Sequence, residues 1–267
     1  MTDSQHISVY REFCENRLVE ILDGKGTRSL YFGGQYLQSR MALHAPHLLL
    51  LPYTHYMMFS LLLARKIERV LLIGLGAGSL VRFLHHHFPT CVIDAVDNSE
   101  RIIKLAKGYF QLPTSHAIRV HCLDGNRFFE VAEPEIEYDM ILLDAFDETG
   151  MATHIYAEPF IRSCATFLAS GGLLISNLWS GGTRPAQDFD AELAPILPGG
   201  LLLPVPERGN VISIRSHHQP DWRRICRGKE QLLQLEKHYH IDFPQMVKVA
   251  MRHNLSIGQR LARLFSL

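Results

Sequence analysis

The chain has 267 residues, a length that suits one domain of ordinary size with a smaller appendage. Basic and acidic residues balance at 27 each, so the overall charge indicates neither a nucleic acid nor an anionic membrane as a partner. The five cysteines are scattered and form no Cys-x-x-Cys motif, which speaks against a disulfide framework or a zinc site. The polar N-terminus lacks a secretory signal, and Pro52 interrupts the longest apolar region, residues 48–64. We therefore expect a cytoplasmic protein without a membrane partner.

The first part of the chain, residues 1–52, is predicted to form a small β-rich domain. Residues 17–22 and 28–32 read as strands on either side of Asp23-Gly24-Lys25-Gly26, a good hairpin turn. Gly33-Gly34 marks a second turn. Such short strands cannot bury themselves alone, so we expect a helix from about Tyr53 to Lys66 to link them to the main domain.

Residues 53–216 alternate strands with helices, which indicates a parallel sheet covered by helices on both faces. The predicted strands are 70–74, 91–97, 118–123, 138–143 and 171–177, followed by a hairpin of 200–205 with 210–215. The fold class is therefore α/β and Rossmann-like, with a mostly parallel seven-stranded sheet and an antiparallel edge hairpin, a detail typical of the class I methyltransferase architecture. Residues 217–267 are predicted to add a helical extension, in which Pro244 suits the first turn of a helix.

The most informative segment lies around the first strand of this sheet. The apolar run Val70 to Ile73 suits a strand buried on both faces, and residues 80–88 continue at helical spacing. Between them stands a glycine turn, formed by Gly74, Gly76 and Gly78. Glycines allow a ligand to approach the backbone, while the helix N-terminus directs free N–H groups at it. Asp97 closes the next strand, about 20 residues beyond the turn, where an acid reaches a ribose diol in such folds. The unit thus predicts an adenosine-containing ligand.

Acids also follow the next two strands of the predicted sheet. Asp124-Gly125 ends the third strand, and Asp144 and Asp147 follow the fourth. Ligands of such sheets bind beyond the carboxyl ends of the strands, so these side chains are expected to meet in one site. Asp124 is placed to accept a hydrogen bond from an adenine amino group. A single Asp after a strand is usually a helix cap or turn residue, but four consecutive strand ends with acids or glycines are hard to explain that way.

Asp144 and Asp147 lie three positions apart and can line one concavity that favours a cation such as a polyamine. An amine that attacks the carbon next to a sulfonium must first be neutral, so one carboxylate can accept its proton while another holds a distal ammonium. A metal site at Asp144, Asp147 and Glu148 is the weaker interpretation, because no histidine stands near at ligand spacing. We expect no metal.

Taken together, these motifs resemble those of the spermidine synthase (polyamine aminopropyltransferase) family, over roughly residues 17–216. The matching positions are Gln38, Tyr53, His55, Gly74, Gly76, Gly78, Asp97, Asp124, Asp144 and Asp147, and Gly125 beside Asp124 is a further candidate for cofactor binding. The resemblance implies transfer of an aminopropyl group from decarboxylated S-adenosylmethionine to a small amine such as putrescine, with release of methylthioadenosine. It implies that Gln38 contacts the cofactor, that Tyr53 and His55 contact the substrate, that Asp144 is the base and that Asp147 anchors the polyamine. A homodimer through the N-terminal strands is likewise expected from the resemblance.

The sequence departs from the family pattern at three positions. Ala77 stands where the family has an Asp that holds the amino end of the cofactor, Tyr56 replaces an acid, and Glu148 replaces a proline. An Asp at position 77 would repel the carboxylate of ordinary S-adenosylmethionine, so Ala77 keeps that cofactor and methyl transfer open as an alternative. A non-catalytic protein that binds an adenosine ligand is the third interpretation.

Overall fold

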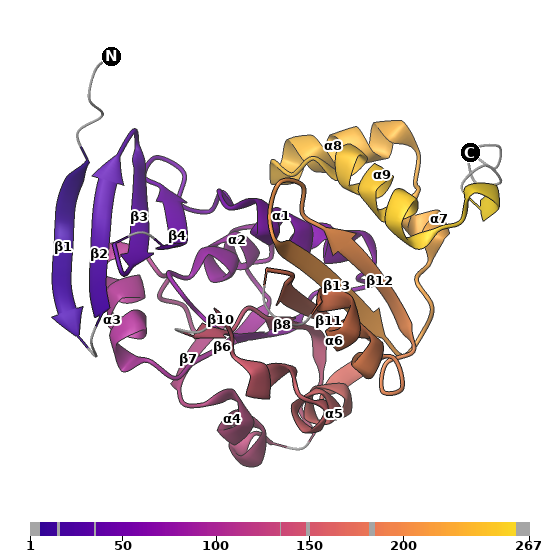
Figure 1. Cartoon of the computed structure of the whole chain (residues 1–267), viewed down its shortest axis with the longest axis horizontal. Coiled ribbons are helices and arrows are strands. Elements are labelled where there is room, and N and C mark those ends of the chain that lie inside the picture. Colours follow the sequence, from indigo (N-terminus) through magenta and orange to yellow (C-terminus); the bar gives the residue numbers. More distant parts are fainter. Residues whose placement is uncertain are drawn as a thin grey trace.

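The computed structural model describes residues 6–14, 17–34, 36–133, 135–147, 150–181 and 185–259, without the side chains of Cys14, Arg17, Asp147 and Thr153. Its centre is a seven-stranded sheet in the order β12-β13-β11-β8-β5-β6-β7 (Figure 1). The strands β5, β6, β7, β8 and β11 run parallel, whereas β13 pairs antiparallel with both β11 and β12. The bounds are β5 (Arg69–Ile73), β6 (Val92–Asp97), β7 (Ile118–Cys122), β8 (Tyr138–Leu143), β11 (Leu168–Trp179), β12 (Gly199–Pro204) and β13 (Asn210–Ser216). The predicted sheet and its antiparallel edge hairpin are confirmed.

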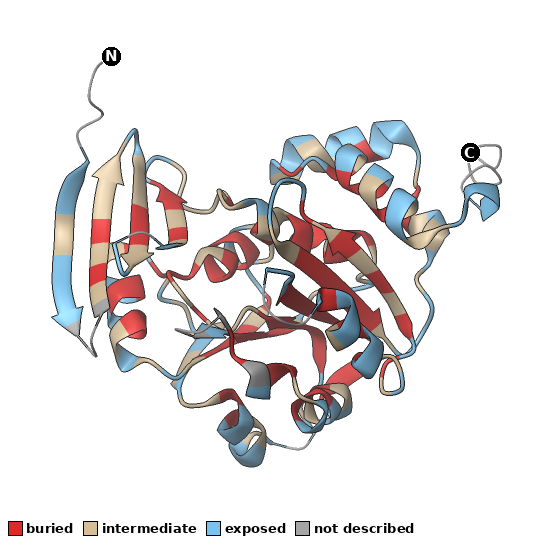
Figure 2. Cartoon of the chain, viewed as in Figure 1, coloured by how far each residue is buried: buried red, intermediate tan, exposed pale blue. Residues whose placement is uncertain are grey.

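The central strands are buried on both faces, as their apolar runs predict. In β5, Val70 and Leu72 belong to one apolar core, while Leu71 and Ile73 belong to a second core on the opposite face. Figure 2 shows the inner strands buried along most of their length. The helices that follow the strands in the chain are α2 (Ser79–His87), α3 (Glu100–Tyr109), α4 (Gly125–Val131), α5 (Glu158–Thr166) and α6 (Ala186–Leu193).

The helix expected from about Tyr53 to Lys66 is shorter and changes type. The α-helical part, α1 (Pro52–Met57), passes into the 3-10 helix η1 (Met58–Leu62). The Ser60 hydroxyl donates to the Met57 carbonyl, which competes with regular helical bonding. Nearly every residue of η1 is buried. An amphipathic α-helix buries only its apolar face, so it does not fit this burial pattern.

The N-terminal residues form a separate antiparallel sheet in the order β1-β2-β3-β4. Its strands are β1 (Ile7–Cys14), β2 (Arg17–Gly24), β3 (Thr27–Phe32) and β4 (Tyr36–Ala42). The hairpin between β2 and β3 was predicted, whereas β1 was not. The apolar residues Ile7 and Phe13 of β1 are exposed, so its sequence lacks the alternation of buried and exposed residues that indicates a strand. One face of the sheet packs on α3 and on the glycine turn, through Ile21, Leu30, Ile102, Phe110 and Ala77.

The C-terminal part contains three helices over the residues that the structure describes. Its helices are α7 (Trp222–Ile225), α8 (Lys229–Tyr239) and α9 (Phe243–Asn254), with Pro244 in the first turn of α9. The last helix packs beside β12, where the Asn254 side chain hydrogen-bonds both backbone groups of Leu202. Figure 1 shows α8 and α9 above the edge hairpin, away from the N-terminal sheet. In the described part of the chain, no helix combines the length and apolar character needed to cross a membrane.

Candidate active site

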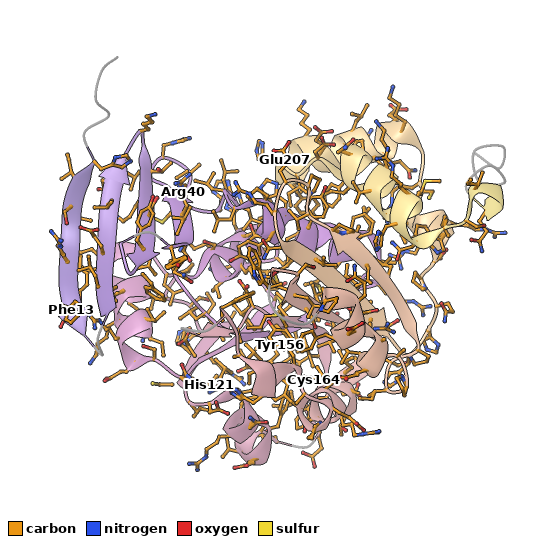
Figure 3. The ribbon with its side chains drawn as sticks, viewed as in Figure 1. Phe13, Arg40, His121, Tyr156, Cys164 and Glu207 are labelled. Carbon is orange, nitrogen blue, oxygen red and sulfur yellow. The ribbon has the colours of Figure 1, made fainter. Side chains whose placement is uncertain are left out.

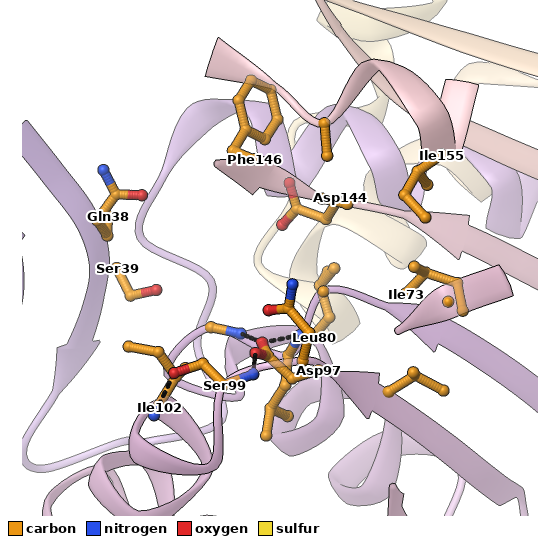
Figure 4. Close-up of a pocket in the computed structure, with 18 of the residues that line it drawn as sticks. Gln38, Ser39, Ile73, Leu80, Asp97, Ser99, Ile102, Asp144, Phe146 and Ile155 are labelled. Atoms are coloured by element: carbon orange, nitrogen blue, oxygen red, sulfur yellow. Dashed lines mark hydrogen bonds between the residues drawn. The ribbon is translucent and has the colours of Figure 1, made fainter. Parts of the chain in front are cut away.

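A cavity of about 440 Å³ lies at the carboxyl ends of the parallel strands, between them and the N-terminal sheet. Figure 4 shows Gln38 and Ser39 on one side and Asp144 and Asp97 on the other. The cavity also receives the short segment after β8, which comprises β9 (Phe146–Asp147), β10 (Gly150–Met151) and the 3-10 helix η2 (Thr153–Tyr156). The sheet topology thus brings together side chains from β4, α1, η2 and four strand ends.

The glycine turn forms one wall of the cavity. Gly74 has φ +95°, and a Cβ there would lie 2.3 Å from the Asp144 carbonyl oxygen, so only glycine fits. Gly76, with φ +51°, also lines the cavity. Gly78, with φ +76°, is the N-cap of α2 and is not among the described residues that line the cavity; a Cβ there would lie 2.6 Å from the Leu112 side chain. The predicted turn therefore combines two glycines at the cavity with a third whose positive φ favours glycine away from the cavity lining.

Asp97 holds this turn in place. Its Oδ2 accepts hydrogen bonds from the backbone N–H groups of Leu75 and Gly76, at 3.0 and 3.4 Å, and its Oδ1 accepts from Ser99 at 2.9 Å. Burial raises the pKa of Asp97, and these three hydrogen bonds oppose the rise. The carboxylate lines the cavity at the end of β6, so it both fixes the glycine turn and faces the cavity.

Asp124 occupies the next strand end and caps α4. Its Oδ1 accepts from the backbone N–H of Asn126 at 2.9 Å, and its Oδ2 lies 3.2 Å from His154 Nε2. Burial raises the pKa of Asp124, but the hydrogen bonds from Asn126 and His154 outweigh it, so the pKa is lowered overall. The adjacent Gly125 is buried, and a Cβ there would lie 2.9 Å from Ile155. Both predicted residues line the cavity.

Asp144 lies deep in the cavity, largely surrounded by protein. The Tyr53 hydroxyl donates to its Oδ2 at 3.1 Å, and the Asn177 side chain donates to its Oδ1 at 2.8 Å. Burial raises the pKa of Asp144 to about 6, although both hydrogen bonds act to lower it. A carboxyl group with this pKa is ionised at neutral pH and close enough to neutrality to exchange a proton.

The other predicted residues are placed differently. Gln38 lines the cavity from β4. The Nε2 of His55 donates to the Leu49 carbonyl at 2.7 Å, and this histidine is not among the residues that line the cavity. The backbone of Asp147 pairs with Gly150, whereas its side chain and the whole of Glu148 lie outside the described residues.

Several residues at the site were not predicted. Ser39 lines the cavity and accepts a hydrogen bond from the Ala77 N–H, while His154 and Phe146 reach it from the segment after β8. Asn177 follows the same rule as the predicted acids, because it lies near the carboxyl end of a strand, and that rule would have found it. The Ala77 side chain is buried in the apolar cluster with Ile102 rather than at the cavity.

The lining of the cavity favours cations. It includes three carboxylates, Asp97, Asp124 and Asp144, and no lysine or arginine among the side chains that the structure describes. Within the described residues, no group of three His, Cys, Asp or Glu side chains is arranged to hold a metal ion.

Two comparisons with known proteins identify the family to which most of this chain is similar. Residues 51–178 match the model of the spermine/spermidine synthase domain. A polyamine aminopropyltransferase of Neisseria meningitidis is 32% identical over 244 residues, which cover 90% of this chain and 92% of the relative.

Solved structures agree on the fold. A probable spermidine synthase from Corynebacterium glutamicum superposes with a TM-score of 0.70 at 18% identity, covering 85% of this chain and 89% of that one. Human methyltransferase-like protein 13, solved in complex with SAH, superposes with a TM-score of 0.61 at 22% identity, covering 73% of this chain and 93% of that one. The methyltransferase-like architecture predicted for the main domain is therefore confirmed.

Proposed function

The chain belongs to the polyamine aminopropyltransferase (spermidine synthase) family, and from this we propose that it transfers an aminopropyl group to a small di- or polyamine such as putrescine. The donor in this proposal is decarboxylated S-adenosylmethionine. Both reactants are cations, a sulfonium and an ammonium. The observation that carries the proposal is a cavity at the strand ends with three carboxylates and no described lysine or arginine in its lining.

The residues of the cavity divide into two groups in this proposal. The glycine turn, Asp97, Asp124 and Gly125 hold the adenosine, as the strand-end position of each suggests. Gln38 faces the aminopropyl end from β4. Asp144 and Tyr53 face the acceptor amine, which Asp147 anchors at its far end. His55 does not contact the substrate in this proposal. It holds the loop before α1, because its Nε2 donates a hydrogen bond to the Leu49 carbonyl.

The reaction follows from this placement. The acceptor nitrogen attacks the methylene carbon next to sulfur, a C–N bond forms, and the C–S bond breaks with its electron pair moving to sulfur. The products are the extended polyamine and neutral methylthioadenosine. Asp144 accepts the proton that the acceptor amine loses, since its ionised form predominates at neutral pH. Displacement in line needs mainly orientation, which the rigid strand ends supply.

The test is to incubate the purified protein with putrescine and either decarboxylated or ordinary S-adenosylmethionine, and to identify the nucleoside released. Methylthioadenosine together with spermidine, formed only with the decarboxylated donor, supports the proposal. S-adenosylhomocysteine would instead identify a methyltransferase, the alternative raised by Ala77. Binding of nucleoside without turnover, over a panel of di- and polyamines, would contradict both enzymatic interpretations.

A further inference from the structure

The two oxygens of Asp144 are each held by a different side chain. Tyr53 reaches Oδ2 from α1, and Asn177 reaches Oδ1 from β11. Asn177 is only 1% exposed, and its neighbours along the strand are apolar or small. Its backbone carbonyl also accepts a hydrogen bond from the Tyr156 hydroxyl at 3.1 Å, which fixes this end of β11 (Tyr156 is labelled in Figure 3). Among the described side chains, the Asp144 carboxylate is the acceptor for the buried NH₂ group of Asn177.

The carbonyl oxygen of the Asn177 side chain also has a hydrogen-bond partner. Its Oδ1 accepts a hydrogen bond from Asn210 Nδ2 at 2.9 Å, across the antiparallel pair β11–β13. An ionised carboxylate only accepts hydrogen bonds, so the NH₂ end of Asn177 must face Asp144 and its carbonyl end must face a donor. Asn210 supplies that donor. If the Asn177 amide turned over, its carbonyl would face the carboxylate and two acceptors would meet.

We propose that Asn177 and Asn210 are positioning residues, a relay in which Asn210 orients the Asn177 amide so that Asn177 holds the Asp144 carboxylate in its reactive place. This inference rests on the proposed function for the role of Asp144 in turnover. The hydrogen bonds themselves do not depend on it. The relay brings the edge hairpin β12–β13 into the active site, although the hairpin contributes no residue to the lining of the cavity.

Among the side chains that the structure describes, few groups other than Asn177 act on the ionisation of Asp144. Among the described side chains, the titratable groups that interact with it are Tyr53 from α1 and Tyr156 from η2, and burial raises the pKa of both phenols well above 10. Both therefore stay neutral in the range where Asp144 titrates. The other carboxylates of the cavity, Asp97 and Asp124, are engaged with backbone N–H groups instead. The donation from Asn177 is thus a main contribution that keeps Asp144 ionised.

The test compares Asn177→Leu, Asn210→Leu and the double variant with the native protein. Two quantities are measured as a function of pH: kcat/KM, and the ¹³C chemical shift of the Asp144 carboxyl carbon in the ligand-free protein, assigned by its loss in Asp144→Asn. We expect Asn177→Leu to move both titrations upward by about one pH unit, the size expected when a hydrogen bond to a charged group is lost. At pH 6, activity then falls about five-fold relative to the native protein and recovers at high pH.

Asn210→Leu is expected to cause a smaller shift in the same direction, and the double variant is expected to match Asn177→Leu, because Asn210 acts only through Asn177. The matched control is Asn254→Leu, which removes two hydrogen bonds to Leu202 on the edge hairpin without touching the relay. It lowers the melting temperature and leaves both titrations in place.

An unchanged Asp144 titration in Asn177→Leu, or additive shifts in the double variant, overturns the relay. If Asn177→Leu does not fold, Asn210→Leu carries the test, since its site is only half-buried. The carboxyl titration tests the relay independently of the proposed function. A native protein that releases no methylthioadenosine refutes the proposed function, while the NMR shifts still decide whether the relay holds Asp144.

Discussion

At the scale of single residues, the three carboxylates of the cavity differ in what holds them. Asp97 accepts three hydrogen bonds from the backbone, and Asp124 caps a helix, so both also serve the fold. The two hydrogen bonds described for the Asp144 carboxylate come from side chains, Tyr53 and Asn177. A carboxylate held in this way can change its protonation without breaking the backbone framework, which makes Asp144 the best candidate for the proton acceptor.

Asp144→Asn is expected to lower turnover by about 10²- to 10⁴-fold, the usual contribution of a general base. Binding of methylthioadenosine is expected to stay close to native, because Asp97, Asp124 and the glycine turn are unchanged. Steady-state release of nucleoside and calorimetric titration measure the two effects. The control is Asp242→Asn at the N-cap of α9, where asparagine caps equally well. Native turnover in Asp144→Asn would exclude this residue as the base.

The raised pKa of Asp144 also predicts how stability depends on pH. Burial raises this pKa to about 6, whereas an unfolded chain has a value of about 3.9. The fold therefore favours the protonated carboxyl, and the stability that this contributes is present below about pH 4 and lost as the pH rises to about 6.

The difference between the pKa of Asp144 in the folded protein and in the unfolded chain corresponds to about 3 kcal/mol of stability. Urea unfolding at several pH values from 4 to 8 measures it. The free energy of unfolding of the native protein is expected to fall relative to Asp144→Asn over this range. A gap that does not change with pH would show that burial leaves the carboxyl unperturbed.

At the scale of elements, the glycine turn is constrained from two sides. Gly74 lies against the Asp144 backbone, so the turn after β5 and the strand end of β8 touch at the edge of the cavity. Backbone contact at this point leaves no room for a side chain. The turn therefore sets the distance between two strand ends and also lines the cavity.

Gly74→Ala is expected to destabilise the protein and to reduce turnover, because the added Cβ would lie 2.3 Å from the Asp144 carbonyl oxygen. The matched control is Gly26→Ala in the β2–β3 turn, where φ is also positive, at +73°, but nothing lies within 4 Å. Both variants carry the backbone strain, so the difference between them isolates the clash, about 1–3 kcal/mol. Thermal and urea unfolding give this difference, and equal losses would show that the backbone makes room.

At the scale of the whole molecule, the cavity belongs to neither sheet alone. The N-terminal sheet supplies Gln38 and Ser39 as one wall, and its position depends on the apolar cluster that joins it to α3 and Ala77. Arg28 adds a polar connection, since it binds both Asp23 and the carbonyl of Tyr109 at the end of α3. Packing between the sheets should therefore control ligand affinity as well as stability.

Ile21→Val tests this coupling against Ile93→Val. Both isoleucines are fully buried, but Ile21 lies in the cluster that joins the two sheets and Ile93 in the core of the main domain. Each loss of a methylene is expected to cost about 0.5–1.5 kcal/mol of stability. The dissociation constant of methylthioadenosine is expected to rise only in Ile21→Val. Equal affinities would mean that the N-terminal sheet is positioned independently of this cluster.

Local patterns in the amino-acid sequence are enough to predict the seven-stranded sheet, the glycine turn and the three acids at the strand ends. These features depend on local patterns: apolar runs buried on both faces, glycine at tight turns, and the rule that ligands bind at the carboxyl ends of parallel strands. The same rule explains why Asp97, Asp124 and Asp144 line one cavity although they lie far apart in the chain.

The contacts that each of these residues makes depend on the three-dimensional fold. Asn177 meets Asp144 across 33 positions because β11 lies beside β8, and Asn210 meets Asn177 because the edge hairpin folds back antiparallel. The same holds for Ala77, which packs against the N-terminal sheet, and for His55, which bonds a backbone carbonyl. Side-chain partners of this kind depend on strand order and register, which no local pattern in the sequence encodes.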